Sequence, residues 1–121
     1  MVQINKATEL LSPGESAVVV LTDGRLFQWN SDDTGTSGNW KFNPNGHQIV
    51  KVIVYYKFEN QPVSDILIGN FEGTVAPQSS DDYKTDGRLV IKMSSLQKIG
   101  ITRVNWKTFA DAGANPVRFL P

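Results

Sequence analysis

The apolar residues of the chain recur mainly with the period of β-strands. Residues 17–21 form a β-branched apolar run, and residues 25–29 continue with alternating apolar and polar side chains after Asp23-Gly24. An Asp-Gly pair between two such runs is typical of a tight hairpin, because glycine accepts the positive φ that the turn requires. The pattern therefore predicts two hairpin-connected strands over residues 17–29.

Three later segments also read as strands. Residues 49–58 are a nearly continuous apolar run, which favours a central strand covered on both faces. Residues 66–71 form a further strand, in which Gly69 indicates a bulge or bend. Residues 88–93 alternate, so that Leu89, Ile91 and Met93 share one face while Arg88, Val90 and Lys92 share the other.

Two polar segments predict loops. Residues 30–47 are rich in Gly, Ser, Asp and Asn and hold neither regular period, although Trp40 and Phe42 lie among them. A loop of this length is often functional, but its aromatic rings can equally anchor it to the core. Residues 76–86 are rich in Ser and Asp and predict an exposed loop.

Helical signals are short. Ala7, Leu10 and Leu11 are consistent with one N-terminal helical turn. Near the end of the chain, Asn105 is a good N-cap, Trp106, Phe109 and Ala110 fall on one helical side, and Gly113 suits the C′ position. We expect one short helix there, followed by an extended segment over residues 115–120.

These elements predict a β-rich α+β fold, a small, partly open β-barrel with one or two short helices. At 121 residues the chain has the usual size of one domain, so residues 1–121 are expected to form a single domain. Hydrophobic residues make up 40% of the sequence and charged residues 20%, which is a globular composition.

Cysteine is absent, which excludes a disulfide framework and a thiolate metal site and makes a cytoplasmic location the easier interpretation. The first residues lack the basic and apolar regions of a signal peptide. The longest apolar stretches are far shorter than the ~20 residues of a membrane helix, so no membrane association is expected.

Charge is balanced overall, with 12 basic and 12 acidic residues, but it is unevenly distributed. Residues 1–86 carry six basic and eleven acidic groups, a net charge of −5, and residues 87–121 carry six basic groups and one acid, a net charge of +5. The basic C-terminal block either complements the acidic part within one fold or forms a face for an anionic partner. Its members are Arg88, Lys92, Lys98, Arg103, Lys107 and Arg118.

The sequence offers few candidate catalytic residues, and we expect neither an enzyme nor a bound cofactor or metal. His47 is the only histidine, so a histidine metal cluster cannot form and a Ser-His-Asp arrangement would depend on a residue in a polar loop. Asp32-Asp33 and Asp81-Asp82 are adjacent acids in polar loops, which are usually solvated surface. Asp65 and Glu72 flank a strand, but the lysine pattern of a metal-dependent nuclease does not follow them.

Aromatic residues with basic neighbours are the positive signal. Tryptophan occurs three times, and such rings either pack in a core or stack on an unpaired or flipped base while Lys and Arg contact phosphate. Residues 103–107 concentrate these groups: Arg103 and Lys107 are cations, Asn105 can read a base edge, and Trp106 supplies a ring. Arg88 and Lys92 add two cations on one strand face.

Six segments, taken in their order along the chain, carry a resemblance to a known family: residues 38–40, 50–56, 67–69, 87–91, 105–106 and 115–119. This order of features resembles the PUA-like superfamily of small barrels, in particular the EVE-like domains that read modified bases. That resemblance implies an aromatic pocket bordered by basic residues and lacking a catalytic centre, with Trp29, Trp40 and Tyr55 as its lining.

The sequence therefore favours a non-catalytic binding module that recognises nucleic acid, such as a modified or flipped base, through an aromatic pocket and a basic C-terminal face. The alternative is a protein-interaction module, such as a small phage or mobile-element inhibitor or an accessory subunit, whose acidic part docks a basic partner.

Overall fold

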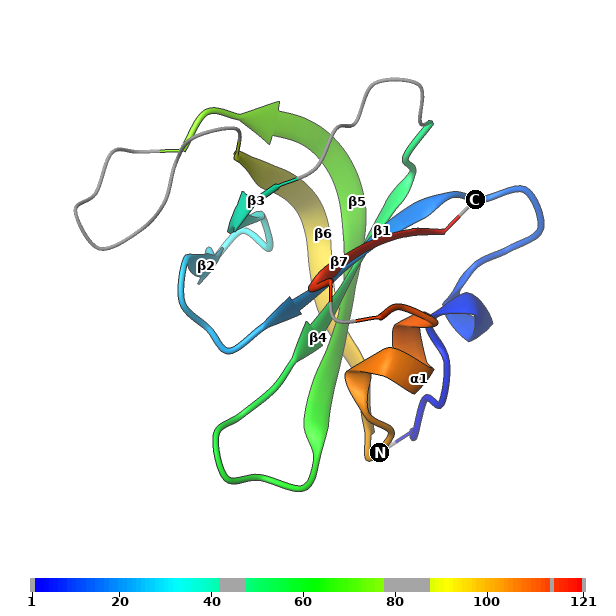
Figure 1. Ribbon diagram of the computed structural model, residues 1–121. Coiled ribbons are helices and arrows are strands. Elements are labelled where there is room, and N and C mark those ends of the chain that lie inside the picture. The colour runs from blue at the N-terminus through cyan, green and yellow to red at the C-terminus, as the bar shows by residue number, and fades with distance from the viewer. Residues whose placement is uncertain (1, 42–47, 78–87, 114, 121) are drawn as a thin grey trace.

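The structure of the protein is a computed structural model that describes residues 2–41, 48–77, 88–113 and 115–120. Seven strands, one 3-10 turn and one short α-helix follow one another along the chain (Figure 1). Their bounds are η1 Ala7–Leu10, β1 Ala17–Thr22, β2 Phe27–Trp29, β3 Gly35–Trp40, β4 Lys51–Tyr56, β5 Ser64–Val75, β6 Leu89–Thr102, α1 Trp106–Ala110 and β7 Val117–Leu120.

All seven strands belong to one sheet, in the order β2-β3-β6-β5-β4-β1-β7. β1 and β4 pair in parallel, and every other neighbouring pair is antiparallel. Within the described residues no pairing joins β2 to β7, so the sheet is open. The predicted β-rich fold is confirmed at this level, with a single mixed sheet and one short α-helix.

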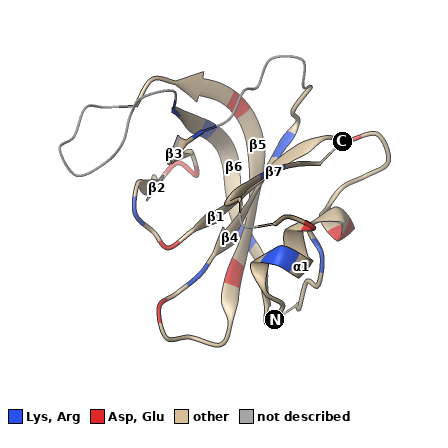
Figure 2. Ribbon diagram, in the orientation of Figure 1, with Lys and Arg blue, Asp and Glu red and all other residues tan. Residues whose placement is uncertain are grey.

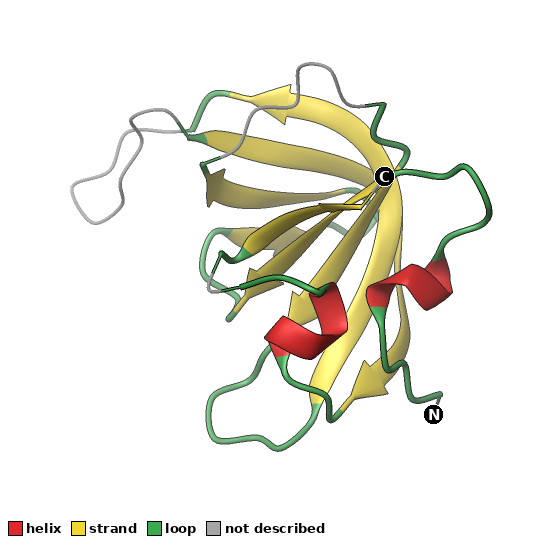
Figure 3. Ribbon diagram, turned by 45° about the vertical axis from the view of Figure 1, so that its right-hand side comes forward, coloured by secondary structure: helices red, strands yellow, loops and turns green. Residues whose placement is uncertain are grey.

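The long strands β5 and β6 bend the sheet strongly (Figure 3). Their register shifts at three places, one of them between Ile68 and Asn70, where the sequence predicted a bulge at Gly69. Ser95 of β6 adds a positive φ of 50° within the strand. Because bulges increase local bending and twist, these irregularities curl β6 and β3 toward the other end of the sheet.

Each face of the sheet buries its own apolar cluster. The helix-side cluster packs under α1 and η1 and includes Val19, Ile53, Tyr55, Ile66, Trp106 and Phe109. The concave-side cluster fills the inside of the curve and includes Val18, Val20, Trp40, Val54, Ile91 and Met93.

The expected central strand is confirmed. β4 lies between β5 and β1, and Val52, Ile53 and Val54 are completely buried, as a strand covered on both faces requires. The alternation around residue 91 is also confirmed, because Ile91 and Met93 are buried whereas Lys92 is exposed.

The predicted hairpin over residues 17–29 is wrong. β1 pairs with β4 and β7, whereas β2 pairs with β3. The turn at Gly24 does form, with φ +102°, but it connects two strands that are not partners. Burial explains the outcome. Val18, Val19 and Val20 of β1 are fully buried and have a partner strand on each side. The short, half-exposed β2 cannot provide a partner of that length and burial.

Two further expectations need correction. The predicted loop at residues 30–47 contains a strand, β3, whose glycines lie close to β6; a Cβ at Gly35 would lie 2.9 Å from Leu96, and one at Gly38 would lie 2.8 Å from Val90. The helix α1 begins at the predicted cap but ends earlier than expected, because Asp111 rather than Gly113 takes the left-handed conformation, with φ 52°. The N-terminal turn and the extended C-terminal segment are confirmed as η1 and β7.

No helix in the part of the chain that the structure describes is long and apolar enough to cross a membrane.

Candidate nucleic-acid interface

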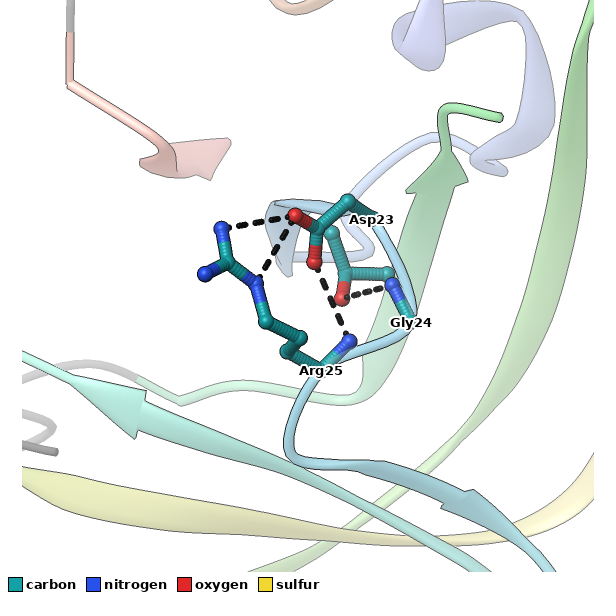
Figure 4. Close-up of polar contacts among 4 residues, drawn as sticks. Asp23, Gly24 and Arg25 are labelled. Carbon is teal, nitrogen blue, oxygen red and sulfur yellow. Dashed lines mark hydrogen bonds and ion pairs between the residues drawn. The ribbon is translucent and has the colours of Figure 1, made fainter. Parts of the chain in front are cut away.

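The turn between β1 and β2 is held by its own side chains. The Gly24 N–H donates to Thr22 Oγ1 at 3.1 Å, and the Arg25 N–H donates to Asp23 Oδ1 at 3.1 Å. The Arg25 guanidinium donates to Asp23 Oδ2 from Nε at 3.0 Å and approaches it with Nη2 at 2.8 Å (Figure 4). These contacts fix the turn before any ligand arrives.

Two residues of this turn have a positive φ, which is ordinary for glycine and uncommon for leucine. Gly24 has φ +102°, and a Cβ at this position would overlap the Tyr56 hydroxyl. Leu26 has φ 56°, a left-handed conformation that is uncommon for a non-glycine residue. Its carbonyl accepts the Gly38 N–H at 3.0 Å, so β3 holds it in place. Strained backbone of this kind is found disproportionately at ligand sites.

An open pocket of about 460 Å³ lies between this turn and β3, and we call it the turn pocket. Trp40 and Leu26 give it apolar surface, whereas Asp23, Arg25 and Lys57 give it one negative and two positive charges. Its lining comprises Leu21, Thr22, Asp23, Arg25, Leu26, Gly38, Trp40 and Lys57.

The acid in the turn pocket is a stable carboxylate. Hydrogen bonds from the Arg25 guanidinium, and next from the Arg25 backbone N–H, lower the pKa of Asp23 below its ordinary value of 3.8. At neutral pH Asp23 is therefore ionised, so it can accept hydrogen bonds but is a weak base.

A second open pocket, of about 710 Å³, lies beside the edge strand β7, and we call it the β7 pocket. Lys41 follows β3 directly, and Arg118 belongs to β7; both are exposed. The complete lining is Lys41, Asp111, Ala112, Gly113, Asn115, Val117, Arg118 and Phe119.

Of the three residues expected to line an aromatic pocket, Trp40 is the one found in the lining of the turn pocket or the β7 pocket as the described residues form them. Trp40 is 9% exposed, and its Nε1–H donates to Ser37 Oγ at 3.0 Å. Tyr55 lies in the helix-side cluster, where its hydroxyl donates to the Val104 carbonyl and its ring contacts Trp106 and Phe109 edge to face.

Trp29 is also separate from the turn pocket lining. It lies on β2, at the edge of the sheet, and is 42% exposed. Its Nε1–H donates to Asp33 Oδ1 at 3.0 Å, so the indole is held against its own β2–β3 turn.

The basic C-terminal block does not form one face. Arg88 directly precedes β6 and Lys92 lies in its first part, whereas Arg103 follows the other end of β6 and Lys107 belongs to α1. Figure 2 shows basic positions both on β6 and on α1. Ten residues of β6, 93–102, lie between Lys92 and Arg103, a path of about 36 Å along the strand at ~3.3 Å per residue. Lys98 lies between them and pairs with Asp65 at 3.1 Å.

Lys92 also points away from the turn pocket. Its neighbours Ile91 and Met93 are buried in the concave-side cluster together with Trp40, so alternation places the exposed Lys92 side chain on the opposite face of β6. Arg88 is half-buried and interacts with other groups.

Residues 103–107 mainly build the helix. Asn105 Oδ1 accepts the Thr108 N–H at 2.9 Å, which satisfies one free donor of α1. Trp106 is 8% exposed and donates its Nε1–H to the Asn115 carbonyl at 2.9 Å. Arg103 and Lys107 remain exposed on either side of them.

The acid pairs of the sequence fall into two groups. Asp32 Oδ1 accepts from the Thr34 hydroxyl at 2.6 Å and from its N–H at 3.1 Å, and these bonds lower the pKa of Asp32. Asp32 therefore stabilises a turn. Asp81-Asp82 and His47 lie outside the described residues, and within the described ranges no three His, Asp or Glu side chains gather as a metal site would require.

Sequence reasoning missed most of the turn pocket. Asp23, Arg25, Leu26 and Lys57 were not predicted as site residues, because Asp-Gly was interpreted only as a hairpin turn. One signal was present: Asp and Arg two residues apart around a glycine can pair across a tight turn and place both charges on one surface.

No protein-family model matches the chain, and neither a curated protein nor a solved structure was found to be similar to it. The PUA-like resemblance therefore stays a prediction.

Proposed function

We propose that the protein is a non-catalytic binding module that recognises nucleic acid and takes one base into the turn pocket. The observation that carries this proposal is the combination of an indole, two cations and a fixed carboxylate around one open pocket. In this proposal Trp40 is the ring of the pocket, as in the sequence-based hypothesis. The basic contacts to the nucleic acid come from Arg25 and Lys57 instead of Arg88 and Lys92.

Each group at the pocket has a matching partner on a nucleotide. The base packs on the apolar surface of Trp40 and Leu26, as bases stack on aromatic side chains in other complexes. Asp23 accepts a hydrogen bond from an exocyclic amine of the base, as carboxylates do from the N4 amine of cytosine. Lys57 is exposed at the rim and contacts the phosphate.

The electrostatics of the pocket favour binding over proton transfer. A general base works best when its pKa lies near the working pH, whereas the pKa of Asp23 is lowered by Arg25. Thr22 Oγ1, the hydroxyl oxygen of the lining, accepts the Gly24 N–H and is nearly buried. Both oxygen-bearing side chains thus shape the turn.

The test is fluorescence anisotropy with labelled single-stranded oligonucleotides at low salt. We expect Lys57→Gln to weaken binding and to reduce the slope of log K against log salt by about 0.7, the value for one phosphate contact on a single strand. Lys92→Gln and Lys6→Gln remove the same charge from exposed positions elsewhere and should leave binding nearly unchanged. Failure of the wild-type protein to bind any oligonucleotide, or equal effects of all three variants, would contradict the proposal.

A protein-interaction module is the second candidate, and the edge strand β2 is the observation that favours it. β2 lies at the end of the sheet, next to the exposed side chains of Leu26 and Trp29, and edge strands can pair with a segment of another protein. If oligonucleotides do not bind, while Trp29→Ala abolishes a stoichiometric complex with an isolated partner protein, this second function replaces the first.

A further inference from the structure

The turn pocket and the β7 pocket lie side by side along one strip of the surface. Trp40 lines the first pocket, and the next residue, Lys41, lines the second. On the opposite side, Leu21 lines the first pocket and donates its N–H to the carbonyl of Pro116 at 2.8 Å, next to Val117 in the lining of the second. We call this strip, between the end of β3 and the paired β1 and β7, the seam.

The seam exists because the sheet does not close. β3 lies near one end of the sheet and β7 forms the other edge, yet Lys41, directly after β3, and residues of β7 both line the β7 pocket. Trp40 and Val117 also share the concave-side cluster, so the two ends of the sheet pack together below the seam without forming a strand pair. The seam therefore lies over buried apolar residues of the concave-side cluster.

The seam is more basic than the chain as a whole. Among the described residues that line the two pockets, Arg25, Lys41, Lys57 and Arg118 carry positive charge, and Asp23 and Asp111 carry negative charge. The net charge of this small surface is thus +2, whereas the net charge of the whole sequence is zero. Asp23 already pairs with Arg25, so Lys57, Lys41 and Arg118 supply the attraction for further anions.

We propose that the β7 pocket is a second subsite, in which Lys41 and Arg118 bind the phosphate of the nucleotide next to the one in the turn pocket. This inference rests on the proposed function and names its ligand class: a single strand of at least two nucleotides lying along the seam. A single strand is the favoured ligand over a duplex, because a base held in a duplex must first be unpaired and unstacked before it can enter the turn pocket.

The geometry favours phosphate at the second subsite rather than a second base. Tryptophan and tyrosine are absent from its described lining, and its two cations come from segments far apart in the sequence, Lys41 after β3 and Arg118 on β7. Arginine presents a planar fork of donors that matches phosphate oxygens. The lining also holds an aromatic ring, Phe119, and an amide, Asn115, but Phe119 is half-buried against the concave-side cluster and Asn115 Oδ1 already accepts the Val117 N–H at 3.1 Å. The exposed cations are therefore the groups best placed for a ligand, and cations are what a phosphate needs.

The test compares 5′-phosphorylated mononucleotides with tetranucleotides of each of the four bases, as DNA and as RNA, by isothermal titration calorimetry at low salt. We expect the preferred tetranucleotide to bind about 10-fold more tightly than its mononucleotide, as a charge-assisted hydrogen bond provides. Lys41→Gln and Arg118→Gln should each remove most of this gain, lower the salt slope by about 0.7 and leave mononucleotide binding unchanged. Arg118→Lys should restore part of the gain, which separates charge from folding effects.

Three results would overturn the inference. Equal affinity for mononucleotide and tetranucleotide would remove the second subsite while leaving the turn pocket in place. A length effect that survives Lys41→Gln and Arg118→Gln, but not Lys92→Gln, would place the second phosphate on the outer face of β6. Absence of binding to any nucleotide would refute the second subsite and the proposed function together. Circular dichroism of each variant confirms that the fold is retained.

Discussion

The two faces of the sheet place the same kinds of residue in different surroundings. On the helix side, Trp106 and Tyr55 contact each other, and Asn105 caps α1, so that rings and polar groups alike find partners within the protein. At the seam, Trp40 borders an open pocket, and Lys57 makes no ion pair with any residue that the structure describes. We therefore expect an aromatic ring beside a cation to mark a ligand site only where the topology leaves the surrounding surface uncovered.

Loss of a ring from the helix side should have the largest effect on stability. Trp106→Ala removes a nearly buried indole together with its hydrogen bond to Asn115, and we expect a loss of about 3–5 kcal/mol in the free energy of unfolding. Urea denaturation followed by circular dichroism measures this loss. Trp29→Ala, at an exposed edge position, is the matched control and should cost much less. A loss below about 1 kcal/mol for Trp106→Ala would show that this ring is not a core residue.

Distortion of the β1–β2 turn should have the next largest effect, and it should affect the seam specifically. Gly24→Ala places a Cβ against the Tyr56 hydroxyl in a backbone conformation with φ +102°, so we expect a loss of about 1–3 kcal/mol and weaker oligonucleotide binding. Differential scanning calorimetry and anisotropy measure the two effects.

Gly14→Ala is the control for that substitution. Gly14 has a similar φ of +84°, but a Cβ there meets nothing within 4 Å. Gly14→Ala should therefore lose only the free energy of unfolding that the positive φ costs a non-glycine residue, and it should leave oligonucleotide binding unchanged. Adding Tyr56→Phe to Gly24→Ala should recover part of the lost stability. Equal behaviour of the two glycine variants would mean that Tyr56 does not position the turn.

The cap of α1 should contribute less than the turn. Asn105→Ala leaves the Thr108 N–H without its acceptor, and we expect a loss of about 1 kcal/mol, measured by urea denaturation, whereas Asn105→Asp should retain the cap. The sequence alone suggested that Asn105 reads a base edge. If Asn105→Asp is as stable as the wild type but changes the base preference, this result would support the interpretation that Asn105 reads a base edge.

The smallest effect concerns pH. Because the folded pKa of Asp23 lies below its ordinary value, its contribution to stability is complete above about pH 5 and is lost as the pH falls through the folded pKa. Asp23 and Arg25 are both exposed, so the contribution is small. Urea denaturation at several pH values should show the difference between the wild type and Asp23→Asn shrinking toward low pH. A difference that grows on acidification would contradict the direction of the shift.

Local patterns predicted the elements whose environment is itself local. The apolar run of β4, the alternation in β6 and the cap at Asn105 were all identified, because burial on one or both faces and capping leave a mark within a few residues. The pairing of strands produced no such local pattern in the sequence. Asp23-Gly24 suggested a hairpin, but the fully buried valines of β1 pair with β4 and β7, which lie far along the chain.

The candidate site could not be predicted from local sequence patterns for the same reason. Gly35 and Gly38 disfavour a strand by propensity, yet they let β3 approach β6 closely, and this places Trp40 opposite the β1–β2 turn. Trp40 was identified from its ring and Arg118 as a member of the basic C-terminal block, whereas Lys57 became a candidate site residue only through strand order. Tyr55 and Trp106 showed the same local pattern and are core residues on the other face.

Indole resonances provide the most direct measurement of the central claim, which is that the open seam and not the helix side receives a base. The chain has three tryptophans, so a ¹H–¹⁵N spectrum should show three indole N–H peaks, assigned with Trp29→Phe and Trp40→Phe. On titration with a single-stranded tetranucleotide we expect the Trp40 peak to shift, while the Trp106 peak, on the opposite face, stays in place. A shift confined to Trp106 or Trp29, or no shift of any indole peak at saturating oligonucleotide, would contradict the account.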